Sequence, residues 1–254
     1  MNASTAPVML ITGGSGSIGS EIAALAAEAG WSVAIHGRRA EAVENAVEAV
    51  ASRAPDAAIS GHIADFSEAG AIERLVEDTI EEHGRIDAVV DCAVGGPPGI
   101  TGRFTETKPE AYTGLAAQSI VALQRLAHAA LPYLARQGGT LIAFISDAGI
   151  FAAPNQTMIG AMRAATIGFV RNLAMEVARD NVRVHAVSPS YVEETRIARQ
   201  IEAVSAKRMD TARTRAGLGL PTPADIAPLV LFLCGPGAKH ITGQVISING
   251  GLNA

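Results

Sequence analysis

The sequence has few aromatic residues, few cysteines and no long uninterrupted apolar run. Aromatic side chains make up 4% of its 254 residues, and the two cysteines, Cys92 and Cys234, lie far apart and outside any metal-binding spacing. We therefore expect reduced thiols in a cytoplasmic protein, and no metal site. The most apolar stretch, 141–162, is interrupted by Asp147 and Pro154. Because a membrane-spanning helix needs about 20 apolar residues, neither such a helix nor a membrane partner is expected.

Positive charge is also scarce. The chain has 20 Lys and Arg against 25 Asp and Glu, which gives a formal net charge of −5. This balance supplies no strong positive field to release counterions from phosphates, and it argues against a nucleic-acid-binding protein. The first seven residues are polar, and the apolar run after them ends at Thr12. No secretion signal is expected from that pattern.

Small and aliphatic residues are abundant, and they follow an alternating pattern. Short β-rich runs, several of them continuously apolar, alternate with longer runs of helical periodicity. Continuously apolar strands are typical of parallel sheets covered on both faces. Expected strands are 8–12, 32–36, 58–63, 88–92, 140–145, 182–186 and 245–249, and expected helices are 18–29, 40–54, 67–82, 108–136, 156–178 and 223–233. The alternation predicts an α/β fold, a Rossmann-type doubly wound parallel sheet of about seven strands flanked by helices, as one domain over 1–254.

A glycine-rich loop follows the first expected strand. Gly14, Gly16 and Gly19 fit the G-x-G-x-x-G spacing, with a strand before them and a helix after them. Such glycines let the backbone approach a pyrophosphate, and the amino end of the helix favours its negative charge. The loop therefore predicts dinucleotide binding, with a ligand-free turn as the alternative. The expected contacts in the loop are Gly13, Ser15, Ser17, Ile18 and Gly19.

The end of the second expected strand discriminates between the two nicotinamide dinucleotides. An NAD-binding site usually has an Asp or Glu there, which holds the ribose diol. This chain has His36-Gly37-Arg38-Arg39 instead, and no carboxylate before Glu41. Guanidinium groups suit a 2′-phosphate, so NADP(H) is expected in preference to NAD(H), with Arg38 the favoured ligand and Arg39 beside it. A solvated helix start is the alternative.

These features together resemble the short-chain dehydrogenase/reductase family over essentially the whole chain. The segment 12–19 is similar to the family's cofactor loop, with Ser17 where Gly is usual, and 189–192 is similar to its nicotinamide-side loop, with Ser190 for Gly. The tail 225–251 is characteristic of the family. The resemblance implies a homodimer or homotetramer acting on a small molecule. It also implies cofactor contacts at Asp65, Phe66, Ala93, Arg163, Pro189 and Val192.

The catalytic positions depart from the family pattern. Family members use a Ser, a Tyr and a Lys four residues after the Tyr, often with an Asn. In this chain Ser146 aligns with the serine, but Ile159 stands at the tyrosine, Arg163 at the lysine and Ser119 at the asparagine. The family's Asn-Asn-Ala-Gly segment appears here as 91–94, Asp-Cys-Ala-Val.

Loss of the tyrosine removes the usual proton donor. Ile159 has no proton to give. In the alternative spacing of enoyl reductases, the tyrosine stands seven residues before the lysine, and this chain has Gln156 there. The Arg163 guanidinium does not deprotonate in proteins. General acid catalysis contributes about 10²–10⁴-fold, so slower hydride transfer can survive. We expect an NADP(H)-dependent oxidoreductase on a small carbonyl, alcohol or enone, with non-standard proton delivery and with Ser146, Arg163 and Ser119 as catalytic positions. The alternatives are a non-catalytic NADP(H) sensor or inactive oligomer partner, and a lyase or isomerase without net hydride transfer.

Five further features carry expectations of their own. Asp147 is interpreted as a solvated loop carboxylate, with a buried acid as the alternative. Tyr191 is interpreted as a packing tyrosine, with a phenol acting in the chemistry as the alternative. His185 is expected to be a core histidine with its hydrogen bonds satisfied, and His36 to lie near the adenosine end. The long segment 193–223 is expected to be a substrate lid, with a surface helix pair as the alternative.

Overall fold

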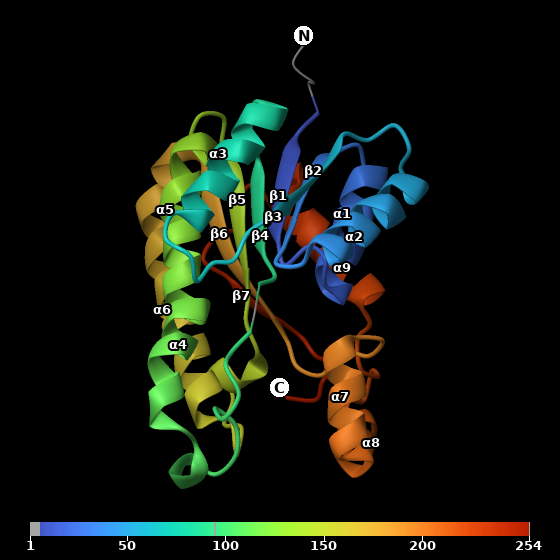
Figure 1. Ribbon diagram of the computed structural model, residues 1–254, viewed down its shortest axis with the longest axis vertical. Helices are drawn as coiled ribbons and strands as arrows, with labels where there is room; N and C mark the ends of the chain where they lie inside the picture. Colours follow the sequence, from blue (N-terminus) through green and yellow to red (C-terminus); the bar gives the residue numbers. More distant parts are fainter. Residues whose placement is uncertain (1–5, 94, 254) are drawn as a thin grey trace.

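The computed structural model describes residues 6–93 and 95–253, which form three layers with a sheet in the middle (Figure 1). All pairings in the seven-stranded sheet are parallel, in the order β3-β2-β1-β4-β5-β6-β7. This confirms the predicted doubly wound parallel sheet. The strands are β1 (Val8–Thr12), β2 (Ser32–Gly37), β3 (Ile59–Ile63), β4 (Ala88–Asp91), β5 (Gly139–Phe144), β6 (Val182–Pro189) and β7 (Val245–Ile248).

Helices cover both faces of the sheet, and each face has its own apolar core. One core is built from α1 (Ser17–Glu28), α2 (Ala40–Arg53) and α9 (Pro223–Cys234). The other is built from α3 (Ala71–His83), α5 (Ala122–Leu134) and α6 (Thr157–Val177). Every residue of β1, β2 and β4 is buried between them, which explains why those strands read as apolar without alternation.

The helix expected over 108–136 is interrupted. A 3-10 turn (Pro109–Ala111) and α4 (Tyr112–Ala116) lead into a π-helical turn (Ala117–Val121) before α5 begins. Periodicity alone did not reveal this interruption, because a π turn changes the hydrogen-bond register without removing helical backbone.

The helix expected over 67–82 begins later than predicted. Asp65 accepts hydrogen bonds from the backbone and hydroxyl of Ser67, at 2.9 and 2.7 Å, and Gly70 then adopts a left-handed conformation (φ 76°). This local turn delays the start of the helix to Ala71.

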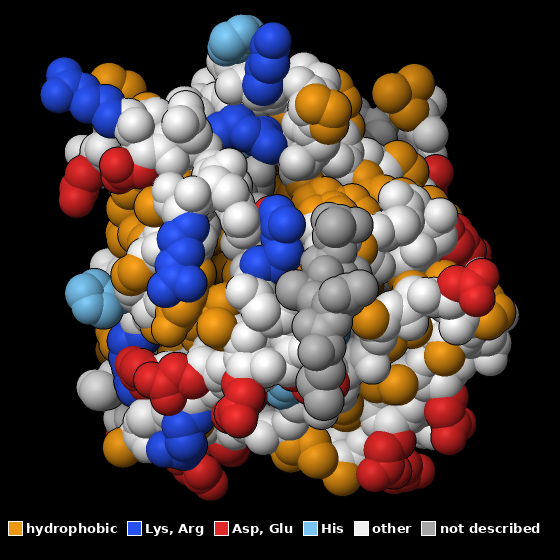
Figure 2. All heavy atoms as spheres, turned by 90° about the horizontal axis from the view of Figure 1, so that it is seen from above, with side chains coloured by type: hydrophobic (Ala, Val, Ile, Leu, Met, Phe, Trp, Pro, Cys, Tyr) orange, Lys and Arg blue, Asp and Glu red, His pale blue; other side chains and the backbone are white. Residues whose placement is uncertain are grey.

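Two helices project beyond the carboxyl ends of the strands. They are α7 (Arg196–Val204) and α8 (Ala206–Arg215), and they lie near the C-terminus in the lower part of Figure 1. The opposite end of the molecule, seen in Figure 2, carries basic, acidic and apolar side chains interspersed. None of the helices in the described part of the chain is long and apolar enough to cross a membrane.

Candidate functional site

The glycine-rich loop joins β1 to α1 at the carboxyl edge of the sheet. Gly13 has a left-handed backbone (φ +65°), and a Cβ there would lie 2.7 Å from the carbonyl carbon and oxygen of Cys92. Only glycine fits this turn, which lets the loop pass tightly over the end of β4. Helix α1 then begins at Ser17, and no side chain of the described residues caps it. Its free N–H groups and positive dipole are available to an anion.

A buried histidine ties the loop to the neighbouring strands. The Gly13 N–H donates to Nδ1 of His36 at 3.3 Å, and Nε2 of His36 lies 3.0 Å from the carbonyl oxygen of Ala64. This arrangement fits a neutral ring with its proton on Nε2, and burial lowers the pKa of His36 to about 4. The ring also stacks on Phe66 with 4.5 Å between centroids. The sequence analysis expected His36 near the adenosine end but did not predict its hydrogen bond to the glycine loop.

The predicted 2′-phosphate residues lie just beyond β2. Arg38 and Arg39 are both exposed, and no carboxylate follows them before Glu41. Asp65, after β3, is also exposed. Hydrogen bonds from Ser67 lower the pKa of Asp65, and the positive charge of Arg38 adds to that effect. The edge therefore carries a basic pair with one carboxylate close to Arg38.

A buried carboxylate, Asp91 at the end of β4, interacts with a buried guanidinium, that of Arg163 on α6. Asp91 Oδ1 accepts from the Thr12 hydroxyl at 2.5 Å and from the Ala93 N–H at 3.2 Å. Burial raises the pKa of Asp91, whereas burial lowers the pKa of Arg163, and each charge favours the charged form of the other. Val94, the last residue of the segment compared with Asn-Asn-Ala-Gly, lies outside the described residues.

Two buried polar atoms, one on Arg163 itself and one on the turn packed against its helix, have no hydrogen-bond partner among the described residues. One is Nε of Arg163, whose side chain comes from α6, and the other is Oγ of Ser119, on the π-helical turn that packs against α6. Buried polar atoms are nearly always satisfied, so such a pair calls for an explanation, for which a bound polar ligand is one candidate. These are two of the three positions predicted to be catalytic.

The third predicted catalytic residue lies on the turn after β5. Ser146 caps a 3-10 turn (Asp147–Gly149), and its Oγ accepts from the Ala148 N–H at 3.4 Å. A Cβ on Gly149 would lie 2.5 Å from Cβ of Arg163, so the turn presses closely on α6. This contact holds Ser146 and Arg163 in one region, although they are 17 residues apart in the sequence.

The solvated position expected for Asp147 is wrong. The residue is 3% exposed, and its carboxylate accepts hydrogen bonds from four side chains, two of them on β6 and β7 and two in the segment after β7. The donors are Ser188 (2.9 Å), Ser247 (3.3 Å), Asn249 (2.6 Å) and Asn253 (3.1 Å). The ends of β5, β6 and β7 converge on this group, a tertiary arrangement that the local sequence does not show.

His185 is buried in β6 as expected, but its hydrogen bonding was predicted wrongly. Neither ring nitrogen makes a hydrogen bond of normal geometry within the described part of the chain. Burial and the charge of Arg183 lower the pKa of His185 to about 4, against a weak opposing contact with the Ile241 backbone. The ring is therefore neutral and belongs to the core.

A cavity of about 490 Å³ opens beside Ser146. Tyr191 lines the cavity and also packs against a small apolar cluster of Ala212, Ala216 and Leu252. Its hydroxyl accepts from Nε of Arg208 at 2.6 Å, and the guanidinium lies 5.5 Å from the ring centroid. Tyr191 is thus a packing residue, as expected, but one with its polar end in a cavity and against a cation.

The predicted site residues follow the carboxyl ends of the strands in order. The loop residues Gly13 to Gly19 follow β1, Arg38 and Arg39 follow β2, and Asp65 and Phe66 follow β3. Ala93 follows β4, Ser146 follows β5, Pro189 ends β6, and Val192 lies just beyond it; the last two are buried. Parallel sheets bind ligands at this edge, where the strand order reverses.

Comparisons with known proteins agree with this geometry. Residues 13–253 match the family model described as enoyl-(acyl carrier protein) reductase. The 3-oxoacyl-[acyl-carrier-protein] reductase of Thermotoga maritima is 30% identical over 249 residues, covering 96% of this chain and 97% of the relative.

Solved structures are similar over the same length. A short chain oxidoreductase from Pseudomonas aeruginosa PAO1, described as containing an atypical catalytic center, is 27% identical with a TM-score of 0.88, covering 97% of both chains. A variant of actinorhodin polyketide ketoreductase with NADPH is 26% identical with a TM-score of 0.87, again covering 97% of both. The glycine loop, the seven-stranded sheet and these matches show that the chain belongs to the short-chain dehydrogenase/reductase family of oxidoreductases.

Proposed function

We propose that this chain is an NADP(H)-dependent oxidoreductase that acts on a small carbonyl compound, alcohol or enone, with non-standard proton delivery. The observation that carries the proposal is the cavity beside Ser146, which opens at the same sheet edge as the glycine loop and the basic pair after β2. The relatives with NADPH and with an atypical catalytic center support it by analogy.

The residues present fit a dinucleotide. The turn at Gly13 has no room for a side chain. Among the described residues, no side chain caps the amino end of α1, and none is a partner for the buried Nε of Arg163 or Oγ of Ser119. In the proposed complex, the loop amides hold the pyrophosphate and Arg38 holds the 2′-phosphate. Arg163 would donate to the nicotinamide ribose. NADPH, when bound, would supply the hydride for reduction of the substrate carbon.

Ser146 and Tyr191 are proposed to act on the substrate oxygen. The Ser146 hydroxyl donates a hydrogen bond that orients the carbonyl, and the Tyr191 hydroxyl gives its proton to the oxygen as the C=O π electrons move onto it. The Arg208 guanidinium, 2.6 Å from the phenol oxygen, stabilises the phenolate that remains. Water then returns the proton to Tyr191. Arg208 is a positioning residue, because it acts through Tyr191.

Tyr191→Phe is expected to lower turnover by about 10²–10⁴-fold, because it removes the proton donor while keeping the ring that packs against α8. NADPH affinity should not change, and both quantities follow from steady-state rates and a fluorescence titration. Tyr133→Phe is the matched control, since Tyr133 also lies under a guanidinium, that of Arg136 at 4.7 Å, but does not line the cavity. Equal turnover in the two variants would exclude Tyr191 as the donor.

The proposed activity is tested by following nicotinamide absorbance with purified protein at high concentration, across a panel of carbonyl compounds and enones. Turnover of at least one member supports the proposal, and flat traces throughout count against it.

A second candidate is a non-catalytic NADP(H)-binding protein, which Ile159 and Arg163 at the tyrosine and lysine positions favour. In that case cofactor raises the melting temperature through RT ln(1 + [L]/Kd), without turnover of any substrate. A lyase or isomerase would instead form product without consuming cofactor.

A further inference from the structure

One wall of the cavity beside Ser146 is strongly basic. Lys207, Arg208 and Arg215, all from α8, line it. Within the described part of the chain, none of the three forms an ion pair with a carboxylate. Arg208 uses one donor on Tyr191, and Arg215 makes only a long contact, 3.5 Å, to the Leu252 carbonyl oxygen. Most of their donors are free for a ligand.

Among the residues that the structure describes, no free negative group lines the cavity to balance these charges. Asp147 is the one carboxylate among its described lining residues. Its two oxygens already accept hydrogen bonds from Ser188, Ser247, Asn249 and Asn253. These donors hold the carboxylate at the strand ends, so no carboxylate of residues 6–93 and 95–253 compensates the basic wall.

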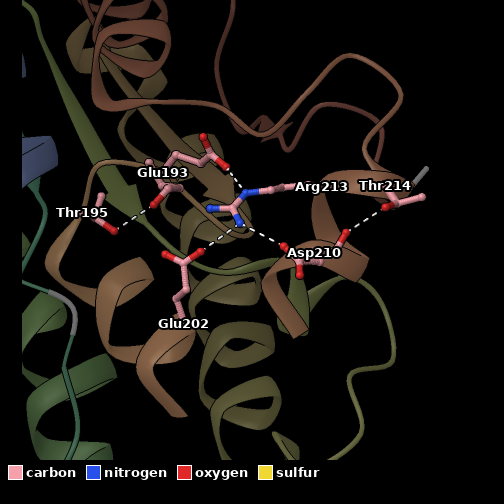
Figure 3. A network of polar contacts seen from close by, with 7 residues as sticks. Glu193, Thr195, Glu202, Asp210, Arg213 and Thr214 are labelled. Atoms are coloured by element: carbon pink, nitrogen blue, oxygen red, sulfur yellow. Dashed lines mark hydrogen bonds and ion pairs between the residues drawn. The ribbon is translucent and has the colours of Figure 1, made fainter. Parts of the chain in front are cut away.

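A fourth cation on the same helix shows the opposite arrangement. Arg213 binds the carboxylates of Glu193 at 2.6 Å, Glu202 at 2.9 Å and Asp210 at 3.2 Å (Figure 3). Three of the four acidic residues in the segment 193–223 are therefore engaged by an arginine that does not line the cavity. Helix α8 thus carries one cation paired with carboxylates away from the cavity wall, and three cations on the wall that pair with no carboxylate of the described chain.

We propose that the cavity binds an anionic carbonyl compound, an oxo acid whose carbonyl lies at Ser146 and whose carboxylate lies at Lys207, Arg208 and Arg215. The volume, about 490 Å³, is in the range of small-molecule sites. Guanidinium and ammonium donors bind carboxylates through charge-assisted hydrogen bonds, and a cleft lined by one sign of charge concentrates ligands of the opposite sign. The placement of the carbonyl rests on the proposed function, whereas capture of the carboxylate does not.

The test compares charged and uncharged forms of the same ketone. Pyruvate, 2-oxobutanoate and 4-oxopentanoate are each titrated beside their methyl esters into the purified protein, once without and once with NADP⁺, with ligand-observed NMR as the readout. No turnover is needed to measure this binding. At least one acid should bind about tenfold or more tightly than its ester, because the ester lacks the charge that the wall recognises.

Variants of the basic wall test whether these cations cause the difference between acid and ester binding. Lys207→Gln combined with Arg215→Gln should weaken binding of that acid by about tenfold or more and leave ester binding unchanged. Arg199→Gln is the matched control, since Arg199 is an exposed cation of α7 that does not line the cavity. It should leave acid binding unchanged.

Three results would overturn the proposal: equal binding of every acid and its ester, no binding of any acid, or equal losses in the control and the double variant. Acid binding that follows the variants, without any NADPH oxidation, would support the anion site while contradicting the proposed oxidoreductase activity. Turnover of neutral ketones alone would support the oxidoreductase activity while contradicting the anion site.

Discussion

Replacing Asp147 with alanine is expected to destabilise the protein by about 3 kcal/mol or more, because four side-chain donors lose a buried, charged acceptor. At about 2–4 °C per kcal/mol for a chain of this size, the melting temperature should fall by about 6–12 °C. The same carboxylate follows Ser146 directly, so cavity binding should weaken as well. Thermal unfolding followed by circular dichroism measures the effect.

Ser247→Ala is the matched control for that substitution. It removes only the longest of the four hydrogen bonds, 3.3 Å, and leaves the carboxylate with three donors. We expect a cost of about 1 kcal/mol or less. If the two variants unfold at the same temperature, Asp147 does not hold the strand ends together as described.

Replacing Arg38 with aspartate is expected to weaken NADPH binding by about 100-fold, since it removes a charge-assisted hydrogen bond to the 2′-phosphate and places a like charge there. NADH should bind as well as before or more tightly, because an acidic residue at this position can hold the ribose diol. Isothermal titration with each cofactor separates the two effects.

Arg39→Asp makes the same change in charge one residue later, where helix α2 begins. It should reduce NADPH affinity less, because Arg38 is the favoured ligand. Equal losses of NADPH and NADH affinity in the Arg38 variant would reject the assignment of the 2′-phosphate to this residue.

Much of the fold could be predicted because local patterns and tertiary structure agree. The apolar strands are buried on both faces, and the glycine loop lies between β1 and α1 as its spacing requires. The ends of the strands come together at one edge of any parallel sheet, so the order of predicted site residues along that edge also followed from the sequence. A single domain and a homodimer or homotetramer stay predictions.

The parts that were not predicted depend on contacts between distant segments. Asp147 looked solvated because its four donors lie between 41 and 106 residues away in the sequence. His36 holds the glycine loop through a proton arrangement that no motif encodes. The pairing of Arg213, in contrast to the three cavity cations of α8 that pair with no described carboxylate, likewise appears only when Glu193 and Glu202 are placed beside Arg213.

The central claim is that the glycine loop and the guanidinium after β2 together bind NADP(H), and calorimetric titration of the unmodified protein with NADPH and NADH tests it most directly. A one-to-one complex with NADPH, about tenfold or more tighter than with NADH, is the predicted result. Absence of heat from NADPH, or tighter binding of NADH, would contradict it.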